Sequence, residues 1–244
     1  MDSTKVAVMG ASAGGNLAAG VAQRLTFDPQ YSDLPTLRLQ ILMYPMLQAI
    51  DFNTPSYQQN GKYAALLLPK QVVVDSWAAY LTSDKKLQKK FSAIMKSATL
   101  KDALSHDNIP DRFKEDGYVA PGITDLGDEG LYKTLKASLF NPSCAPLMRD
   151  SLRGLPEAYV ATCTYDILRD DGIQYVRKLK ADDVKVTWMH YDDGVHCMAQ
   201  FSADGPFSLD AGFKCRKEVF AFISFTLKER RRKKRENVVE VKKN

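Results

Sequence analysis

The sequence has 244 residues, which is enough for one α/β domain with a sizeable core. Its 45% apolar and 26% charged content is ordinary for a globular protein, and no run approaches the roughly 18 apolar residues of a membrane span. The net charge of +5 arises at the C-terminal end, because the residues from Lys228 onward hold nine Lys/Arg and three Glu and leave −1 for the rest.

The first predicted elements form a strand, a turn and a helix. Residues 5–9 are a short apolar run that stops at Gly10, which predicts a buried parallel strand. Beyond Gly14, the side chains of Leu17, Val21 and Leu25 recur at helical spacing and predict a helix. A second, mainly apolar stretch at residues 37–44 predicts another strand, which ends before a proline.

Residues 46 to about 140 have a different pattern. A helix is expected after Pro69, with Val73, Trp77, Tyr80 and Leu81 on one face. A stretch rich in Lys, Ser and Asp follows, with little periodicity. This part of the chain is therefore expected to be an inserted region of helices and loops over the core.

Alternation of strands and helices returns after residue 155. Residues 158–162 and 184–191 predict strands, and helices are expected around residues 173–179 and 220–227. Such alternation predicts the α/β class, with a mainly parallel sheet and flanking helices. We expect one domain over residues 1–227, with the inserted region at about residues 46–140, and a basic tail without regular structure over residues 228–244.

The sharpest motif is Gly10-Ala-Ser12-Ala-Gly14, a G-x-S-x-G sequence between the predicted strand and helix. In a nucleophile elbow of this pattern, a strained turn presents the serine hydroxyl above the sheet, and small residues on either side avoid clashes. The backbone N–H of Ala13 would then point at a developing oxyanion. The motif alone also fits a glycine-rich turn that caps a helix or cradles a phosphate.

The expected general base is a histidine on the C-terminal side of the acid, because triads built on a G-x-S-x-G elbow follow the chain order Ser, acid, His. His106 precedes any plausible loop for the acid, and His190 lies inside a strand pattern. His196 follows that strand in the segment 192–196, where Gly194 is expected to let a loop carry the imidazole over the sheet. We therefore predict His196 as the base.

The expected acid is Asp166, the first carboxylate after the strand at residues 158–162. It would orient the imidazole and stabilise the imidazolium. Asp170 and Asp171 fall at the start of the next helix, where capping is the default role of a carboxylate.

Several segments resemble one family. Gly10-Ala-Ser-Ala-Gly-Gly-Asn-Leu-Ala18 is similar to the GDSAGGNLA segment of hormone-sensitive-lipase-type α/β-hydrolases. Within that class, residues 44–60, 163–172 and 193–196 resemble the arylacetamide deacetylase and neutral cholesterol ester hydrolase family. The resemblance runs from about Val6 to Phe225 and implies that residues 1–227 are a partial α/β-hydrolase domain.

The resemblance implies a serine esterase of lipophilic acyl esters or arylacetamides, with Ser12 as nucleophile, Asp166 as orienting acid and His196 as base. It implies no metal and no organic cofactor. It also implies attachment to the endoplasmic reticulum membrane by an N-terminal anchor in the full-length proteins. The family's Asp before the serine is replaced by Ala11, which removes a polar neighbour of the elbow.

Two family features are expected upstream of the elbow, where this sequence has only eleven residues. They are the membrane anchor and the HGGG segment that supplies further oxyanion donors. Loss of one such donor costs about 10²–10³ in rate. The alternative is therefore a catalytically weak or inactive hydrolase-like protein that binds lipophilic ligands or partners.

The tail and the cysteines suggest no further chemistry. The basic run at residues 228–235 matches nuclear-localisation, nucleic-acid or anionic-lipid patterns, with contact to a membrane surface as an alternative. It has no interleaved aromatic residues, so we expect a solvated extension and no nucleic-acid partner. Cys144, Cys163, Cys197 and Cys215 form no CxxC pair and are expected to be isolated thiols. The sequence gives no basis for predicting an oligomeric state.

Overall fold

The computed structural model describes residues 5–61, 68–94, 104–115, 117–120 and 129–241. The chain divides into two compact units, Met1–Cys197 and Met198–Asn244. The division falls inside the domain expected at residues 1–227, and those domain limits remain a prediction. The first unit contains all strands of the described residues, helices α1–α6 and the candidate site residues Ser12, Asp166 and His196.

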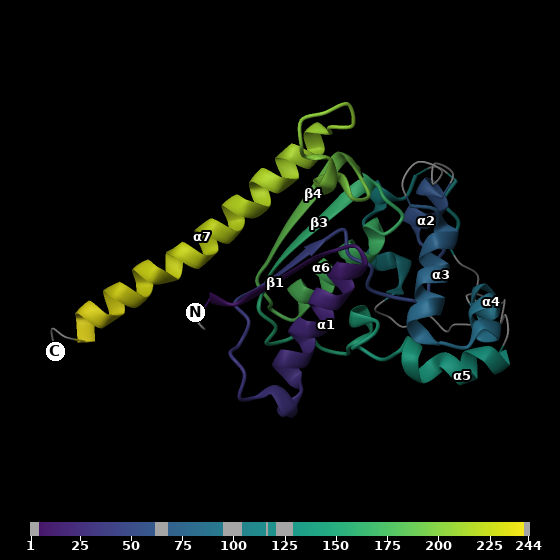
Figure 1. The fold of residues 1–244 in the computed structure, drawn as a ribbon, viewed down its shortest axis with the longest axis horizontal. Coiled ribbons are helices and arrows are strands. Elements are labelled where there is room, and N and C mark those ends of the chain that lie inside the picture. The colour runs from purple at the N-terminus through teal and green to yellow at the C-terminus, as the bar shows by residue number, and fades with distance from the viewer. Residues whose placement is uncertain (1–4, 62–67, 95–103, 116, 121–128, 242–244) are drawn as a thin grey trace. The chain divides into compact units, whose positions relative to one another are not determined.

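The first unit is built on a sheet of four parallel strands in the order β1-β2-β3-β4. The strands are β1 Ala7–Ala11, β2 Leu39–Met43, β3 Glu157–Tyr165 and β4 Val186–Val195 (Figure 1). All residues of β2 are buried, including Gln40, which agrees with the mainly apolar sequence of this strand. The predicted α/β class with a parallel sheet is confirmed.

Two helices, α1 Ala13–Phe27 and α6 Arg169–Ala181, pack against the sheet. Gln23 on α1 donates its Nε2 hydrogen to the Tyr175 hydroxyl of α6 at 3.5 Å, so the two helices lie on the same face. The same amide donates to the Pro146 carbonyl at 2.8 Å. This buried amide therefore ties both helices to the 3₁₀ turn Pro146–Met148.

The region expected as an insertion holds four helices in its described parts (Figure 1). They are α2 Pro55–Asn60, α3 Lys70–Leu81, α4 Lys85–Ile94 and α5 Glu129–Leu139. Buried side chains of this region, including Trp77 and Phe91, join the same apolar core as residues of β2 and α6. Short 3₁₀ turns occur at Pro29–Tyr31, His106–Asn108 and Asp111–Phe113.

The predicted helix α1 is present, but its expected apolar stripe does not face the core. Leu17 is 56% exposed and Val21 43%, next to the edge strand β1, where Met9 is 52% exposed. The buried face carries small residues instead, such as Ala18 and Ala22. Small side chains let the helix approach the sheet closely, whereas periodicity alone cannot tell which face points inward.

The turn between β1 and α1 holds Ser12 in a left-handed backbone conformation, with φ 56° and ψ −121°. Such a conformation is strained for a residue with a side chain. It is fixed from both sides, because the Ser12 N–H donates to the Met43 carbonyl at 2.9 Å and the Ser12 carbonyl accepts from Gly15 at 2.9 Å. The turn is therefore locked to strand β2.

The glycines around Ser12 differ in what they allow. A Cβ atom on Gly10 would overlap the Gly14 carbonyl, and one on Gly15 would lie 2.8 Å from the Pro45 Cβ atom. A Cβ atom on Gly14 would meet nothing within 4 Å. The expectation that both flanking glycines avoid clashes is thus correct for Gly10 and wrong for Gly14, because the close packing falls one residue later.

The second unit contains the 3₁₀ turn η7 Met198–Phe201 and helix α7 Asp210–Val241. Helix α7 continues through residues 228–241, where the sequence was expected to lack regular structure. Lys, Arg and Glu dominate this stretch and have high intrinsic helix propensity, which accounts for the difference.

We predict opposite outcomes for two alanine substitutions in the turn. Gly10→Ala should destabilise the protein by about 1–3 kcal/mol, because the new methyl group overlaps the backbone of the next helix. Gly14→Ala should change stability by less than about 1 kcal/mol, because space is open and alanine favours a helix. Urea unfolding of both variants measures the difference. Equal losses of stability would contradict the packing described here.

Candidate active site

Three side chains far apart in the sequence form one hydrogen-bonded chain. The Ser12 Oγ atom lies 2.9 Å from His196 Nε2, and His196 Nδ1 lies 2.9 Å from Asp166 Oδ2. The side chain of Asp166 is fully buried and that of His196 is 5% exposed. The structure therefore brings together the three residues that the sequence singled out as nucleophile, base and acid.

Each of the three follows the carboxyl end of a parallel strand. Ser12 comes after β1, Asp166 after β3 and His196 after β4. These ends meet at one edge of the sheet, which is where open α/β sheets usually carry their sites. The second oxygen of Asp166, Oδ1, accepts the Leu168 N–H at 2.9 Å, so the carboxylate is held while it contacts the imidazole.

The path to His196 differs from the expected loop. Strand β4 extends to Val195, and Val195 pairs with Tyr165 beyond a register shift. The backbone of Gly194 does not have a positive φ, whereas that of Cys197 does, with φ 62°. The expected swing at Gly194 is thus wrong. A bulged continuation of the β3–β4 pair carries the imidazole to Ser12 instead, and the chain turns after it.

Two opposing effects act on the pKa of His196. Burial lowers this pKa, because a charged imidazolium is poorly solvated there, but the Asp166 carboxylate raises it through charge and a hydrogen bond. The net direction is upward from the ordinary value of 6.5. Asp166 therefore makes His196 a stronger proton acceptor than a free imidazole.

A backbone donor lies beside the serine. Ala13 is the first residue of α1, and its N–H donates to no residue in the described part of the chain. The amino end of a helix carries partial positive charge, which favours an anion at this place. Ala13 therefore stays the predicted oxyanion donor.

Two site residues were missed by the sequence interpretation. Asn16 is buried on α1, and its Nδ2 atom donates to the carbonyls of Met46 at 2.9 Å and Cys144 at 2.8 Å. Tyr44 is buried with φ 36°, and its ring centroid lies 5.1 Å from that of His196 in an edge arrangement. An asparagine inside the motif and an aromatic residue at a strand end were the available signals.

Asp170 and Asp171 do not cap helix α6. Asp170 Oδ2 accepts the Ser56 N–H at 2.6 Å, and Asp171 Oδ2 accepts the Leu47 N–H at 2.8 Å. Burial raises the pKa of Asp171 to about 7, against hydrogen bonds to its carboxylate that lower it. Both carboxylates therefore anchor the segment after β2. The expected capping role is wrong, because the carboxylates accept hydrogen bonds from N–H groups of that segment.

The two other histidines lie outside this chain of hydrogen bonds. His106 Nε2 is 2.6 Å from Asp51 Oδ2, in a buried pair. His190 lies in β4, as its strand pattern predicted, with its ring nitrogens 2.9 Å and 3.0 Å from the hydroxyls of Thr162 and Thr164.

Comparison with known proteins agrees with this architecture. The sequence profile of the alpha/beta hydrolase fold matches residues 1–106 and 105–200. Arylacetamide deacetylase from Oryctolagus cuniculus is 36% identical over 230 residues, which are 91% of this chain and 55% of that protein. Neutral cholesterol ester hydrolase 1 from Rattus norvegicus is 33% identical over 237 residues, 93% of this chain and 56% of that protein.

Solved structures give the same picture. A thermophilic carboxylesterase, EstE1, cloned from a metagenomic library superposes with a TM-score of 0.60 at 25% identity, over 93% of this chain and 56% of that one. An esterase from Pyrobaculum calidifontis superposes with a TM-score of 0.58 at 22% identity, over 94% and 54%. The chain thus spans about half the length of the relatives it matches. The resemblance predicted from the sequence is confirmed, and the chain belongs to the alpha/beta hydrolase fold family.

Proposed function

We propose that this chain is a serine hydrolase of carboxylic esters, with Ser12 as nucleophile, His196 as general base and Asp166 as orienting acid. The observation that carries the proposal is the buried chain of two 2.9 Å contacts from Ser12 through His196 to Asp166. Nucleophile–base and base–acid contacts of this length are what nucleophilic catalysis by serine needs.

In the proposed reaction the Ser12 Oγ atom attacks the carbonyl carbon of the ester while its proton moves to His196 Nε2. Asp166 stabilises the imidazolium that forms, and the Ala13 N–H stabilises negative charge on the carbonyl oxygen. His196 then gives the proton to the leaving alkoxide, which leaves an acyl group on Ser12. Water activated by His196 hydrolyses this acyl-serine and restores the site.

The proposed substrates are lipophilic acyl esters or arylacetamides. The support is the likeness to relatives named arylacetamide deacetylase and neutral cholesterol ester hydrolase 1, together with the motifs around the three site residues. This chain spans only about half of each of those relatives, so its activity on such substrates is proposed here and has to be measured on this chain.

A location at the endoplasmic reticulum membrane is proposed only through the same likeness. Among the helices of the described residues, none is long and apolar enough to cross a bilayer.

The first prediction concerns covalent labelling. A fluorophosphonate should label the folded protein at Ser12, because His196 takes the proton of the attacking hydroxyl. Ser12→Ala should abolish labelling, whereas Ser151→Ala, a change at an exposed serine, should leave it intact. In-gel fluorescence with peptide mass spectrometry measures both. A folded protein that stays unlabelled, or a Ser12→Ala variant that still reacts, would overturn the proposal.

The second prediction concerns the pH dependence of labelling. The rate should rise with pH as His196 loses its proton, and the midpoint should lie above 6.5 because Asp166 raises the pKa. In Asp166→Asn the carboxylate charge is gone and burial, which lowers the pKa, dominates. The midpoint should then move to lower pH, while the plateau rate falls by roughly 10²–10⁴. Labelling quenched at set times from pH 5 to about 11 measures this, and an unmoved midpoint would contradict the assigned pair.

A further inference from the structure

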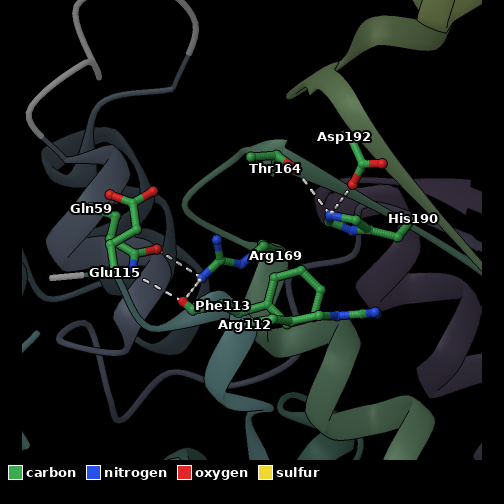
Figure 2. A pocket seen from close by; sticks show the side chains of 8 residues that line it. All are labelled: Gln59, Arg112, Phe113, Glu115, Thr164, Arg169, His190 and Asp192. Atoms are coloured by element: carbon green, nitrogen blue, oxygen red, sulfur yellow. Dashed lines mark hydrogen bonds and ion pairs between the residues drawn. The ribbon is translucent and has the colours of Figure 1, made fainter.

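A polar cavity of about 390 Å³ lies at the carboxyl ends of β3 and β4, within the first unit (Figure 2). Neither Ser12, Asp166 nor His196 lines it. Its lining consists of Gln59, Arg112, Phe113, Glu115, Thr164, Arg169, His190 and Asp192. The proposed esterase mechanism uses none of these side chains, so the cavity needs an explanation of its own.

The floor of the cavity holds a buried arginine with spare hydrogen-bonding capacity. Arg169 is 2% exposed, and its Nε donates to Asp170 Oδ1 at 2.9 Å. Its Nη2 donates to Gln59 Oε1 at 3.1 Å and to the Phe113 carbonyl at 2.8 Å. The Nη1 atom donates to no side chain or backbone group of the described residues, and Figure 2 shows it directed into the cavity. A guanidinium binds planar carboxylates strongly through such donors.

The rim carries charge of the opposite sign. Glu115 is exposed, and the side chain of Asp192 is 99% exposed, with Oδ1 3.6 Å from His190 Nε2. Arg112 balances one of these carboxylates, and its guanidinium lies 4.8 Å from the centre of the Phe113 ring. The formal charges of the lining therefore cancel, with Arg169 buried at the floor and Arg112 exposed beside the two carboxylates at the mouth.

The walls between floor and rim are held in place. His190 lies with its nitrogens against two threonine hydroxyls and its ring centroid 4.8 Å from that of Phe113. Burial lowers the pKa of His190 from 6.5, so the ring adds no positive charge at neutral pH. Because these side chains are already held in place, they lose little conformational entropy when a ligand binds.

From this arrangement we propose that the cavity binds a small zwitterion, a molecule with one carboxylate and one ammonium group, of the free α-amino acid type. The carboxylate takes the open Nη1 donor of Arg169, and the ammonium group takes Glu115. A net-neutral lining with separated charges favours a ligand with the reverse charge order over a simple anion or cation. The volume of about 390 Å³ leaves room for a ligand side chain and water.

The site touches the backbone of the proposed catalytic acid. The Arg169 N–H donates to the Asp166 carbonyl at 3.2 Å, and Asn60 Nδ2 donates to the carbonyls of Thr164 at 2.8 Å and Asp166 at 3.1 Å. The proposal nevertheless does not depend on esterase activity, because binding can be measured with the Ser12→Ala variant.

The experiment is a saturation-transfer NMR titration of the Ser12→Ala variant of the 244-residue chain with glycine and L-alanine, each against acetate and methylamine. The zwitterions should bind saturably, and acetate and methylamine should bind about tenfold more weakly because each lacks one charged contact. Equal binding of acetate and glycine would reduce the cavity to an anion site and overturn the proposal, as would the absence of saturable zwitterion binding.

Substitutions test the carboxylate contact and the ammonium contact separately. Glu115→Gln should weaken glycine binding and strengthen acetate binding, since it removes one negative charge at the mouth. Arg169→Lys should abolish both, and its circular dichroism melt reports whether it folds. The matched control is Asp183→Asn, an exposed carboxylate paired with Arg153 outside the cavity, which should change neither. Glycine affinity that is unchanged in Glu115→Gln would contradict the assigned ammonium contact, whatever the behaviour of Arg169→Lys.

Discussion

The rest of the site depends on the backbone conformation of Ser12. With φ 56° and ψ −121°, the residue leaves strand β1 and starts helix α1 within one step. Its N–H is bonded to Met43 in the next strand, and its carbonyl accepts from Gly15 and Asn16. Strain in a residue with a side chain persists only where the surroundings over-determine it. Here a glycine before the turn and hydrogen bonds on both sides supply that constraint, and the hydroxyl reaches His196 as a result.

Buried polar contacts hold the loops that complete the site. Asn16 binds the backbone after β2, and Asp171 accepts N–H groups of Leu47 and Gln48 in the same segment. Asp170 reaches Ser56 at the start of α2. Each buried carboxylate or amide costs desolvation and is retained because its partners are backbone donors and acceptors that would otherwise be unpaired. The segment after β2 is thus fixed to helices α1 and α6, beside the imidazole.

Much of this arrangement could be predicted from the sequence. The G-x-S-x-G pattern between an apolar strand and a helix identified Ser12, and chain order narrowed three histidines to His196. Asp166 followed from its place after a strand end. These are local signals, and the parallel sheet converts them into proximity because strand ends meet at one edge.

The rest depended on information that no local pattern holds. Leu17 and Val21 have helical spacing, yet they face outward. The opposite face of α1 carries small side chains, which allow closer packing against the sheet. Gly194 suggested a loop, whereas pairing with β3 carries the strand on to Val195. Carboxylates at a helix start suggested caps, but Asp170 and Asp171 reach donors more than a hundred residues away in the sequence.

The most direct measurement is a crystal structure of the chain after reaction with a small alkyl fluorophosphonate. The account predicts phosphorus bonded to Ser12 Oγ, His196 Nε2 within hydrogen-bond distance of that oxygen, and a phosphonyl oxygen roughly 2.7–3.1 Å from the Ala13 nitrogen. Phosphorus on another residue, or a phosphonyl oxygen turned away from Ala13 with His196 separated from Asp166, would contradict it.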